Sequence, residues 1–382
     1  SSDLLSALRF YDMGVSTKKA QSRKKSPGQI LQKLFLSEYF ILYLTIICFV
    51  CVIPFVPKII TRSNLLNVLS NLWPLLVVAV GQTFVLLLGG IDLSQVSIIG
   101  VTSVMGTVLI SDSFNEGTFA STPLWGWLIG ADGGPLAGSP MAIPVCILVM
   151  LLVGTLIGLF NGYFVAQFKM PPFMVTLVTQ MFFLNFAIFL TQSRNVMGLP
   201  DGFKEIGKGS LGGIIPYAAI LTVTVTVIGY FILAKLVLGK WIYATGANIT
   251  ASVVSGVPTK KVTVFCYAFS GFCAAAGSVI YSARLNMGRP TLGEDLTMDI
   301  VGAAVLGGTS LLGGKGKVTW TIFGVLFYTI LFNVLNLFNL SYYTINIVKG
   351  CVILVAAFLD VVRTKLAVKI SRGRCLIWVK VY

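Results

Sequence analysis

The chain has 382 residues, of which 56% are hydrophobic and only 11% are charged. Its mean hydropathy of +0.90 excludes an ordinary soluble domain and indicates a membrane protein. The 28 basic and 13 acidic side chains give a net charge of +15, and the absence of histidine excludes imidazole general-base chemistry and argues against a metal site.

The first 36 residues carry a basic cluster ahead of the first apolar run, and no small-residue cleavage site follows that run. We therefore expect a basic cytoplasmic tail over 1–36 and an uncleaved first span rather than a signal peptide. A second basic cytoplasmic tail is expected over 362–382.

Between these tails, apolar runs punctuated by glycine, proline and charges predict one transmembrane domain over 37–361. The expected fold class is all-α, a polytopic bundle of about ten transmembrane helices. Within the fourth span, Gly154, Gly158 and Gly162 are spaced for close contact with another helix. The predicted spans are about 37–57, 66–88, 95–111, 141–166, 173–191, 214–237, 262–281, 297–312, 318–338 and 341–361.

The distribution of basic residues predicts the orientation of the chain. With the N-terminus inside and ten crossings, most of the 28 Lys and Arg residues fall on the cytoplasmic side. This bias accounts for the net charge without nucleic-acid binding. The loop 112–140 carries three acids and a tryptophan pair, which suits the extracytoplasmic side.

Two glycine-rich segments share an apolar-Gly-Gly-x-polar-Leu core, "VLLLGGIDLS" and "AAVLGGTSLL". Either chance or an internal duplication, as is common in transporters, explains the match. The second segment continues as "GGTSLLGGKGK" over 307–317 and fails the phosphate-loop spacing, because neither its lysine nor a hydroxyl stands where that loop requires it. ATP binding by this route is excluded.

The carboxylates Glu294, Asp295 and Asp299 form the one acidic cluster that could support general acid–base catalysis. We predict instead a solvated, charged external turn. The expectation is therefore a transport subunit with no catalytic residue and no metal site.

The longest polar insert on the predicted cytoplasmic face, 239–261, contains a short helix over Ala247 to Gly256. Asn248 or Thr250 is placed to cap its start, and Gly256 is placed to end it. Two alternatives remain open at this point: a helix that lies at the membrane interface, or one that docks into a groove on a soluble partner.

Five motifs in the same order along about 66–361 carry a family resemblance: "GQTFVLLLGGIDLS", "GLFNGYFVAQFKMPPFMVTL", "GANITASVVSGVPTKKV", "DIVGAAVLGGTSLLGGKG" and "IVKGCVILVAAFLD". The chain resembles the permease subunits of sugar-type ATP-binding-cassette (ABC) importers, the branch that includes ribose, xylose, arabinose, galactose and autoinducer-2 permeases. In that family the cytoplasmic insert contacts the ATPase. The resemblance therefore implies these coupling residues: Gly246, Ala247, Asn248, Ala251, Ser255, Gly256 and Val257.

The resemblance also implies the partners. They are a second permease copy, an ABC ATPase on the cytoplasmic side and an extracytoplasmic sugar-binding protein, in the bacterial cytoplasmic membrane with both termini inside. This chain is expected to bind no cofactor, since ATP and Mg would be used by the ATPase. It departs from the family after "GGIDLS", where Gln95 and Val96 stand before Ser97 in place of a usual glycine, so a different local geometry is expected.

Polar side chains inside apolar runs are candidates for the substrate path, because such residues usually face the interior of the bundle, a partner or water. For the amides the alternative is hydrogen bonding between helices, and for the phenylalanine it is contact with lipid or core. An aromatic face beside hydroxyl and amide groups suits a sugar. The candidates are Gln82, Asp92, Asn161, Phe173 and Thr176.

Two charged residues leave further alternatives open. Asp92 follows a Gly89–Gly90 helix break, where it could cap the next helix, line the path or couple protons. Lys349 could extend towards the surface or pair with a carboxylate. The rival function is an ion-gradient-driven secondary transporter or channel, for which only Asp92 and Lys349 are candidate titratable groups.

Overall fold

The computed structural model describes residues 37, 39–355, 357–358 and 361–362. The predicted tails 1–36 and 362–382 lie outside the described residues, apart from residue 362. The fold belongs to the unit Ile41–Tyr382, which clusters separately from Ser1–Phe40. Among the described residues, six helices are long and apolar enough to cross a membrane. They are α4 (Arg62–Leu87), α7 (Ala142–Gln167), α8 (Pro172–Thr191), α10 (Tyr217–Lys235), α13 (Thr259–Leu285) and α15 (Val318–Leu337).

Each of the ten predicted spans coincides with a helix, but within the described residues four of these helices are shorter than a full span. The four are α3 (Phe40–Val52), α5 (Gln95–Ile110), α14 (Thr297–Leu306) and the helix Tyr342–Val355. The predicted all-α fold is confirmed, whereas the count of ten spans stays a prediction.

The predicted span 297–312 is wrong in length. Its helix, α14, ends at Leu306, and Gly307 and Gly308 follow. Gly308 has φ +107°, a backbone conformation that ends a helix and that residues with a Cβ rarely adopt.

Short elements connect the long helices. One antiparallel pair of strands pairs Ser210 with Pro216. The short elements are η1 (Pro57–Ile60), α6 (Glu116–Phe119), α9 (Asp201–Lys208), β1 (Ser210–Leu211), β2 (Ile215–Pro216), α11 (Val237–Ala247), α12 (Ile249–Val254) and η2 (Glu294–Leu296).

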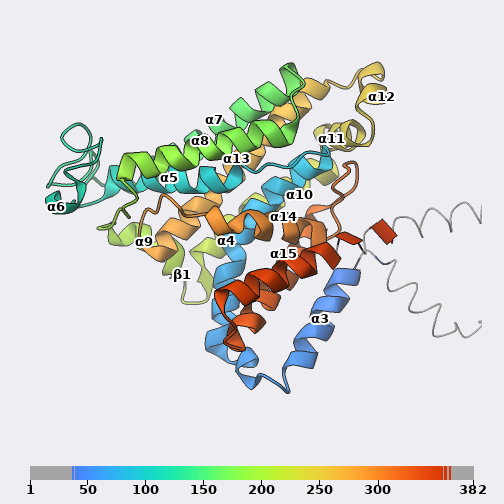
Figure 1. The fold of residues 1–382 in the computed structure, drawn as a ribbon, viewed down its shortest axis with the longest axis horizontal. Coiled ribbons are helices and arrows are strands. Elements are labelled where there is room, and N and C mark those ends of the chain that lie inside the picture. The colour runs from blue at the N-terminus through green and yellow to red at the C-terminus, as the bar shows by residue number, and fades with distance from the viewer. Residues whose placement is uncertain (1–36, 38, 356, 359–360, 363–382) are drawn as a thin grey trace, which may run out of the picture. The chain divides into compact units, whose positions relative to one another are not determined.

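The core of the bundle forms around α4, α5 and α13, whose side chains are mostly buried. Helices α7 and α8 pack against α5, and α7 also packs along α13; α10, α14 and α15 pack against α4 (Figure 1). Glycine permits the closest of these contacts, because a Cβ on Gly154 of α7 would lie only 2.7 Å from the carbonyl oxygen of Gly271 in α13. The predicted close contact through the glycines of the fourth span is confirmed.

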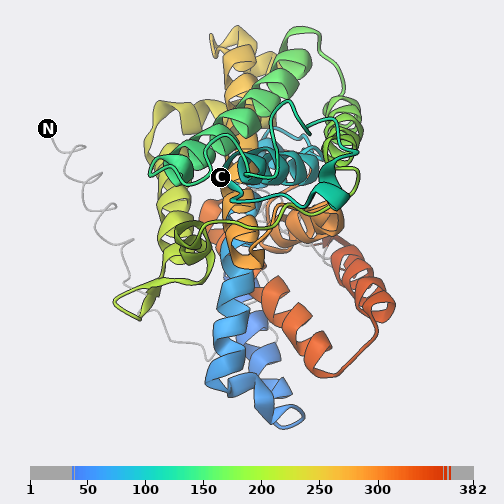
Figure 2. The same ribbon diagram turned by 90° about the vertical axis from the view of Figure 1, so that its left-hand side faces the viewer.

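Helix α13 runs from one end of the bundle to the other. Its first turn follows α12 and lies beside the end of α7, whereas its last turn packs against α9. The loop 111–141, which contains α6, leads into the opposite end of α7 and projects away from α12 (Figure 1, and facing the viewer in Figure 2).

The two glycine-rich segments meet in the structure. Gly307 and Gly308 directly follow α14, and Gly89 and Gly90 come one residue after the end of α4. The Gly314 N–H donates to the Leu87 carbonyl over 2.8 Å. The hydroxyls of Thr83 and Thr321 are 2.7 Å apart beside this contact. These contacts join the end of α4 to the loop after α14 and to the start of α15.

Candidate functional site

Asp92 lies in the break between α4 and α5, with 2% of its surface exposed. Its Oδ1 accepts hydrogen bonds from the Ser94 N–H (3.0 Å) and the Ser94 hydroxyl (2.6 Å). Its Oδ2 accepts from the Ser270 hydroxyl of α13 (2.6 Å). Ser94 is the N-cap residue of α5, so Asp92 organises the turn into that helix and ties it to α13.

The serine hydroxyls extend these contacts to two more helices. The Asn161 amide of α7 donates to the Ser94 hydroxyl over 2.8 Å. The Thr179 hydroxyl of α8 in turn donates to Asn161 Oδ1 over 2.6 Å. Helices α5, α7 and α8 are therefore joined by side-chain hydrogen bonds that begin at the helix break.

Two glutamines complete this arrangement on the other side of the break. Gln95 Nε2 donates to the Ser270 hydroxyl over 2.9 Å. With its amide oriented so that both groups are satisfied, Gln82 donates to Gln95 Oε1 (2.9 Å) and to the backbone oxygen of Asp92 (3.2 Å). We call these seven side chains the polar network: Gln82, Asp92, Ser94, Gln95, Asn161, Thr179 and Ser270.

The polar network is closed in this conformation, because none of its seven residues is more than 4% exposed. Each serine hydroxyl accepts from an amide, so its single proton is free to point at Asp92, which is the final acceptor. Hydroxyl, amide and carboxylate groups are also those that bind sugar hydroxyls. A separation of α5 and α13 from α7 and α8 would present them to a solute.

The structure brings together four of the five predicted path residues. Gln82, Asp92 and Asn161 belong to the polar network, and the buried Thr176 donates to the Ile91 carbonyl beside it over 3.2 Å. Phe173 stands apart with 53% of its surface exposed. The structure adds four residues that the prediction missed, all polar residues within or beside apolar runs: Ser94, Gln95, Thr179 and Ser270.

Gln95 also explains how the chain accommodates its departure from the family motif. Besides Ser270, its amide donates to the Val78 carbonyl of α4 over 3.2 Å. A large polar side chain at the first position of α5 thus bonds α4 and α13 at the place where the sequence predicts a different local geometry.

A cavity of about 800 Å³ lies between this helix break and α12. Gly90, Pro172 and Tyr267 line its inner part, and Lys169 and Lys260 also contribute to its walls. The buried hydroxyl groups of Tyr267 and Thr245 line the cavity without a hydrogen-bond partner in the described part of the chain. The cavity therefore offers unused polar groups between the polar network and α12.

The predicted cytoplasmic helix is present as α12, and both of its ends are closed by local hydrogen bonds. The Asn248 side chain accepts from the Ala251 N–H over 2.9 Å, so Asn248 rather than Thr250 is the cap. At the other end Gly256 has φ +79°, its N–H donates to the Val253 carbonyl, and the Val257 N–H donates to the Ser252 carbonyl. This is a Schellman termination, which requires a left-handed residue where Gly256 stands.

The outer face of α12 is apolar and exposed. Val254 is 85% exposed, and Ile249 and Val253 are each more than half exposed. Of the predicted coupling residues, five are exposed and Val257 is half-buried; the exposed ones are Ala247, Asn248, Ala251, Ser255 and Gly256. An exposed apolar helix of this kind marks an interaction surface.

Gly246, the remaining predicted coupling residue, has a visible structural role. A Cβ at this position would collide with the Leu87 carbonyl and lie 2.8 Å from the Gly314 nitrogen. Gly246 therefore lets the end of α11 approach the two glycine-rich loops. Because α12 follows α11 directly, α12 begins close to the helix break.

The comparison with known proteins agrees with this architecture. Residues 64–357 match the family described as "Branched-chain amino acid transport system / permease component". The chain belongs to this permease family. The matched region contains both the polar network and α12.

Among its relatives are two ribose import permeases. The protein from Haemophilus influenzae is 34% identical over 311 residues, which is 80% of this chain and 87% of that protein. The one from Bacillus subtilis is 35% identical over 306 residues, 80% of this chain and 86% of that protein. The D-allose transport system permease protein of Escherichia coli is 27% identical over 352 residues, 91% of this chain and 98% of that protein. No solved structure matches the chain significantly.

The permease also contains an ion pair that corrects one prediction. Asp299 does not lie in a solvated loop but in the first turn of α14, with its side chain 13% exposed. Lys349 Nζ lies 3.0 Å from both of its carboxylate oxygens, and the Tyr328 hydroxyl donates to Asp299. Of the two alternatives for Lys349, the structure shows pairing with a carboxylate. Burial favours pairing because an unpaired charge is costly there.

Proposed function

We propose that this permease forms the membrane path of an ABC importer for a monosaccharide or a similar small polar solute. The importers named among its relatives carry ribose and allose, and a further relative is named as an L-arabinose permease. The polar network supports the proposal because it concentrates hydroxyl and amide groups inside the bundle. The chain itself performs no catalysis and binds no cofactor; ATP and Mg are used by the partner ATPase.

The proposal that an ATPase drives this permease rests on the structure of α12. Its caps are complete and its apolar face is exposed, as expected of a helix that inserts into a groove on another protein. The proposed partner at α12 is the ATPase on the cytoplasmic side. A sugar-binding protein delivers the solute at the opposite end, near the loop 111–141 and α9, and two permease copies form the complete path.

A movement of α12 can be transmitted to the polar network through direct packing contacts. Gly246 packs against the end of α4, and the helix break that follows carries Asp92. When the ATPase closes, α12 shifts with it, and the break rearranges between two discrete packings. Alternating access then follows from the opening of the network on one side at a time.

Reconstituted transport tests this function. The permease, its ATPase and its binding protein would be placed in liposomes, and uptake of labelled ribose, allose, arabinose and leucine measured with and without ATP. We expect ATP-dependent uptake of one of the sugars and none of leucine. The matched control carries an ATPase variant that binds but does not hydrolyse ATP, and it is expected to show background uptake.

The rival function predicts the opposite pattern in the same liposomes. An ion-gradient-driven carrier would take up solute with the inactive ATPase and would respond to an imposed proton or sodium gradient. In the structure, Lys349 is paired with Asp299, and Asp92 accepts three hydrogen bonds. Binding and release of an ion at either group would require these interactions to break. Gradient-driven uptake without ATP hydrolysis would overturn the proposal.

A further inference from the structure

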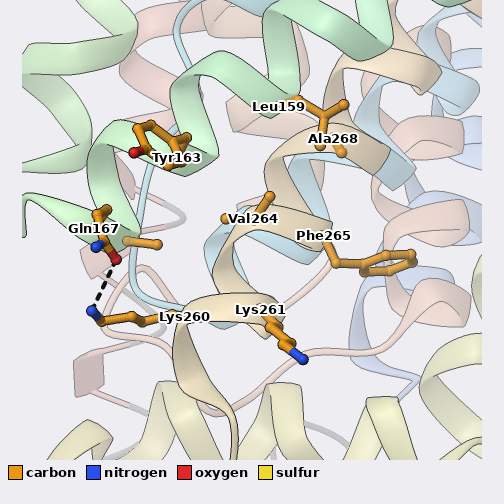
Figure 3. A pocket seen from close by; sticks show the side chains of 9 residues that line it. Leu159, Tyr163, Gln167, Lys260, Lys261, Val264, Phe265 and Ala268 are labelled. Carbon is orange, nitrogen blue, oxygen red and sulfur yellow. Dashed lines mark hydrogen bonds between the residues drawn. The ribbon is translucent and has the colours of Figure 1, made fainter.

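A separate apolar groove runs between α7 and α13 on the outer side of the bundle, with a volume of about 390 Å³ (Figure 3). It shares only Ala166 and Lys260 with the cavity described above. Its lining residues are Leu159, Tyr163, Ala166, Gln167, Lys260, Lys261, Val264, Phe265 and Ala268.

The groove changes from charged to apolar along its length. Lys260 and Lys261 lie in the first turn of α13, while Ala268 lies about 10 Å deeper, at 1.5 Å per residue. On the facing helix, Gln167 ends α7 and Leu159 lies about two turns deeper. Both helices are long and apolar enough to cross the membrane, so the lysines lie at the level of the membrane surface and the apolar part lies at the depth of hydrocarbon.

The charged end of the groove has no carboxylate to neutralise it. Lys260 donates to Gln167 Oε1 over 2.9 Å (Figure 3), and neither lysine forms an ion pair within the described part of the chain. No Asp or Glu occurs in the sequence between Glu205 and Glu294. Glu205 itself is in α9, which packs at the far end of α13.

The helix dipole increases this positive potential. Lys260 and Lys261 occupy the N-terminal turn of α13, where the dipole already favours negative charge and disfavours lysine. No side chain caps this end of the helix. Two exposed cations in this position would be stabilised by an anion from outside the chain.

We propose that this groove binds an anionic phospholipid from the membrane leaflet on the α12 side. Its phosphate lies against Lys260 and Lys261, and one acyl chain lies along the apolar surface formed by Leu159, Val264 and Ala268. Charge complementarity at the surface and an apolar floor at hydrocarbon depth are the two features that such a lipid requires. A second copy of this chain in a two-fold contact would instead bring like charges together.

Native mass spectrometry of the full chain in detergent tests this assignment. The protein would be offered equal amounts of phosphatidylglycerol and phosphatidylcholine with identical acyl chains. We expect preferential binding of phosphatidylglycerol, and a K260Q/K261Q variant should bind it on the order of tenfold to thirtyfold more weakly, since each lysine near an anionic headgroup contributes a factor of about five. The matched control is K235Q/K240Q, which removes two exposed lysines outside the groove and should change the preference little.

Two further arms distinguish the alternative occupants. Ala268→Phe fills the apolar part and leaves both lysines in place, so it should also reduce phosphatidylglycerol binding by several fold. Inorganic phosphate at millimolar concentration should not displace the lipid. Three results would overturn the proposal. The first is an equal loss of lipid binding in K235Q/K240Q, and the second is displacement of the lipid by free phosphate. The third is a K260Q/K261Q variant that binds lipid normally but no longer shows the mass of a dimer.

Discussion

At the scale of single residues, Asp92 shows how a carboxylate is retained inside an apolar bundle. It accepts three hydrogen bonds, two from Ser94 and one from Ser270, at distances of 2.6–3.0 Å. Hydrogen bonds to a charged group are stronger than neutral ones, and a buried donor left without an acceptor costs about 1–3 kcal/mol. The structural contribution of Asp92 is therefore the positioning of α5 against α13.

Substitution of Asp92 separates this positioning from the charge. Asp92→Asn keeps an acceptor for Ser94 and should lower the free energy of unfolding by about 1 kcal/mol, whereas Asp92→Leu leaves three donors unsatisfied and should lower it by about 3 kcal/mol or more. Thermal melting of the purified permease in detergent measures the difference, and Asp201→Leu in the exposed part of α9 is the control. Equal stability of the Leu and Asn variants would contradict this role.

At the scale of elements, α12 is defined almost entirely by local interactions. Asn248 and Gly256 close its two ends through bonds to atoms no more than five residues away, which is why its presence was predictable from the sequence. Its separation from α11 and the exposure of Ile249 and Val253 were not predictable, because they depend on Gly246 packing against a helix distant in sequence.

Gly256 provides the test at this scale. Gly256→Leu forces a side chain into a left-handed backbone conformation at about 1–2 kcal/mol, and the strain should shift α12 and reduce stimulation of the ATPase by about tenfold while the permease stays in the membrane. The measurement is ATPase activity of the reconstituted complex with and without binding protein and sugar. Gly256→Asn tolerates the same backbone conformation and should stay near the unaltered protein. Unchanged stimulation in Gly256→Leu would show that α12 is not the coupling element.

At the scale of the whole molecule, α13 determines which surfaces face opposite sides of the membrane. Its 27 residues span about 40 Å, enough to cross the hydrocarbon. Lys260 lies in its first turn, and Glu205 lies in α9, which packs at its last turn. The positive-inside bias predicts that the Lys260 end faces the cytoplasm.

Cysteine labelling tests this orientation. In a background without the native cysteines, Lys260→Cys should react with a membrane-impermeant thiol reagent only from the cytoplasmic side, and Glu205→Cys only from outside. Intact cells and inside-out vesicles provide the two directions, and each variant serves as the control for the other. Labelling of both positions from the same side would refute the predicted topology.

The sequence by itself determined the membrane class, the approximate positions of the helices, the glycine that ends α12 and the family, because hydropathy, charge bias and capping act over short stretches of chain. Only the tertiary structure decided that Gln95, Ser270 and Thr179 join Asp92 in one network, and that Asp299 pairs with Lys349. Those contacts link residues far apart in the sequence. Their partners depend on helix packing, which glycine contacts such as Gly154 with Gly271 establish and which no local pattern specifies.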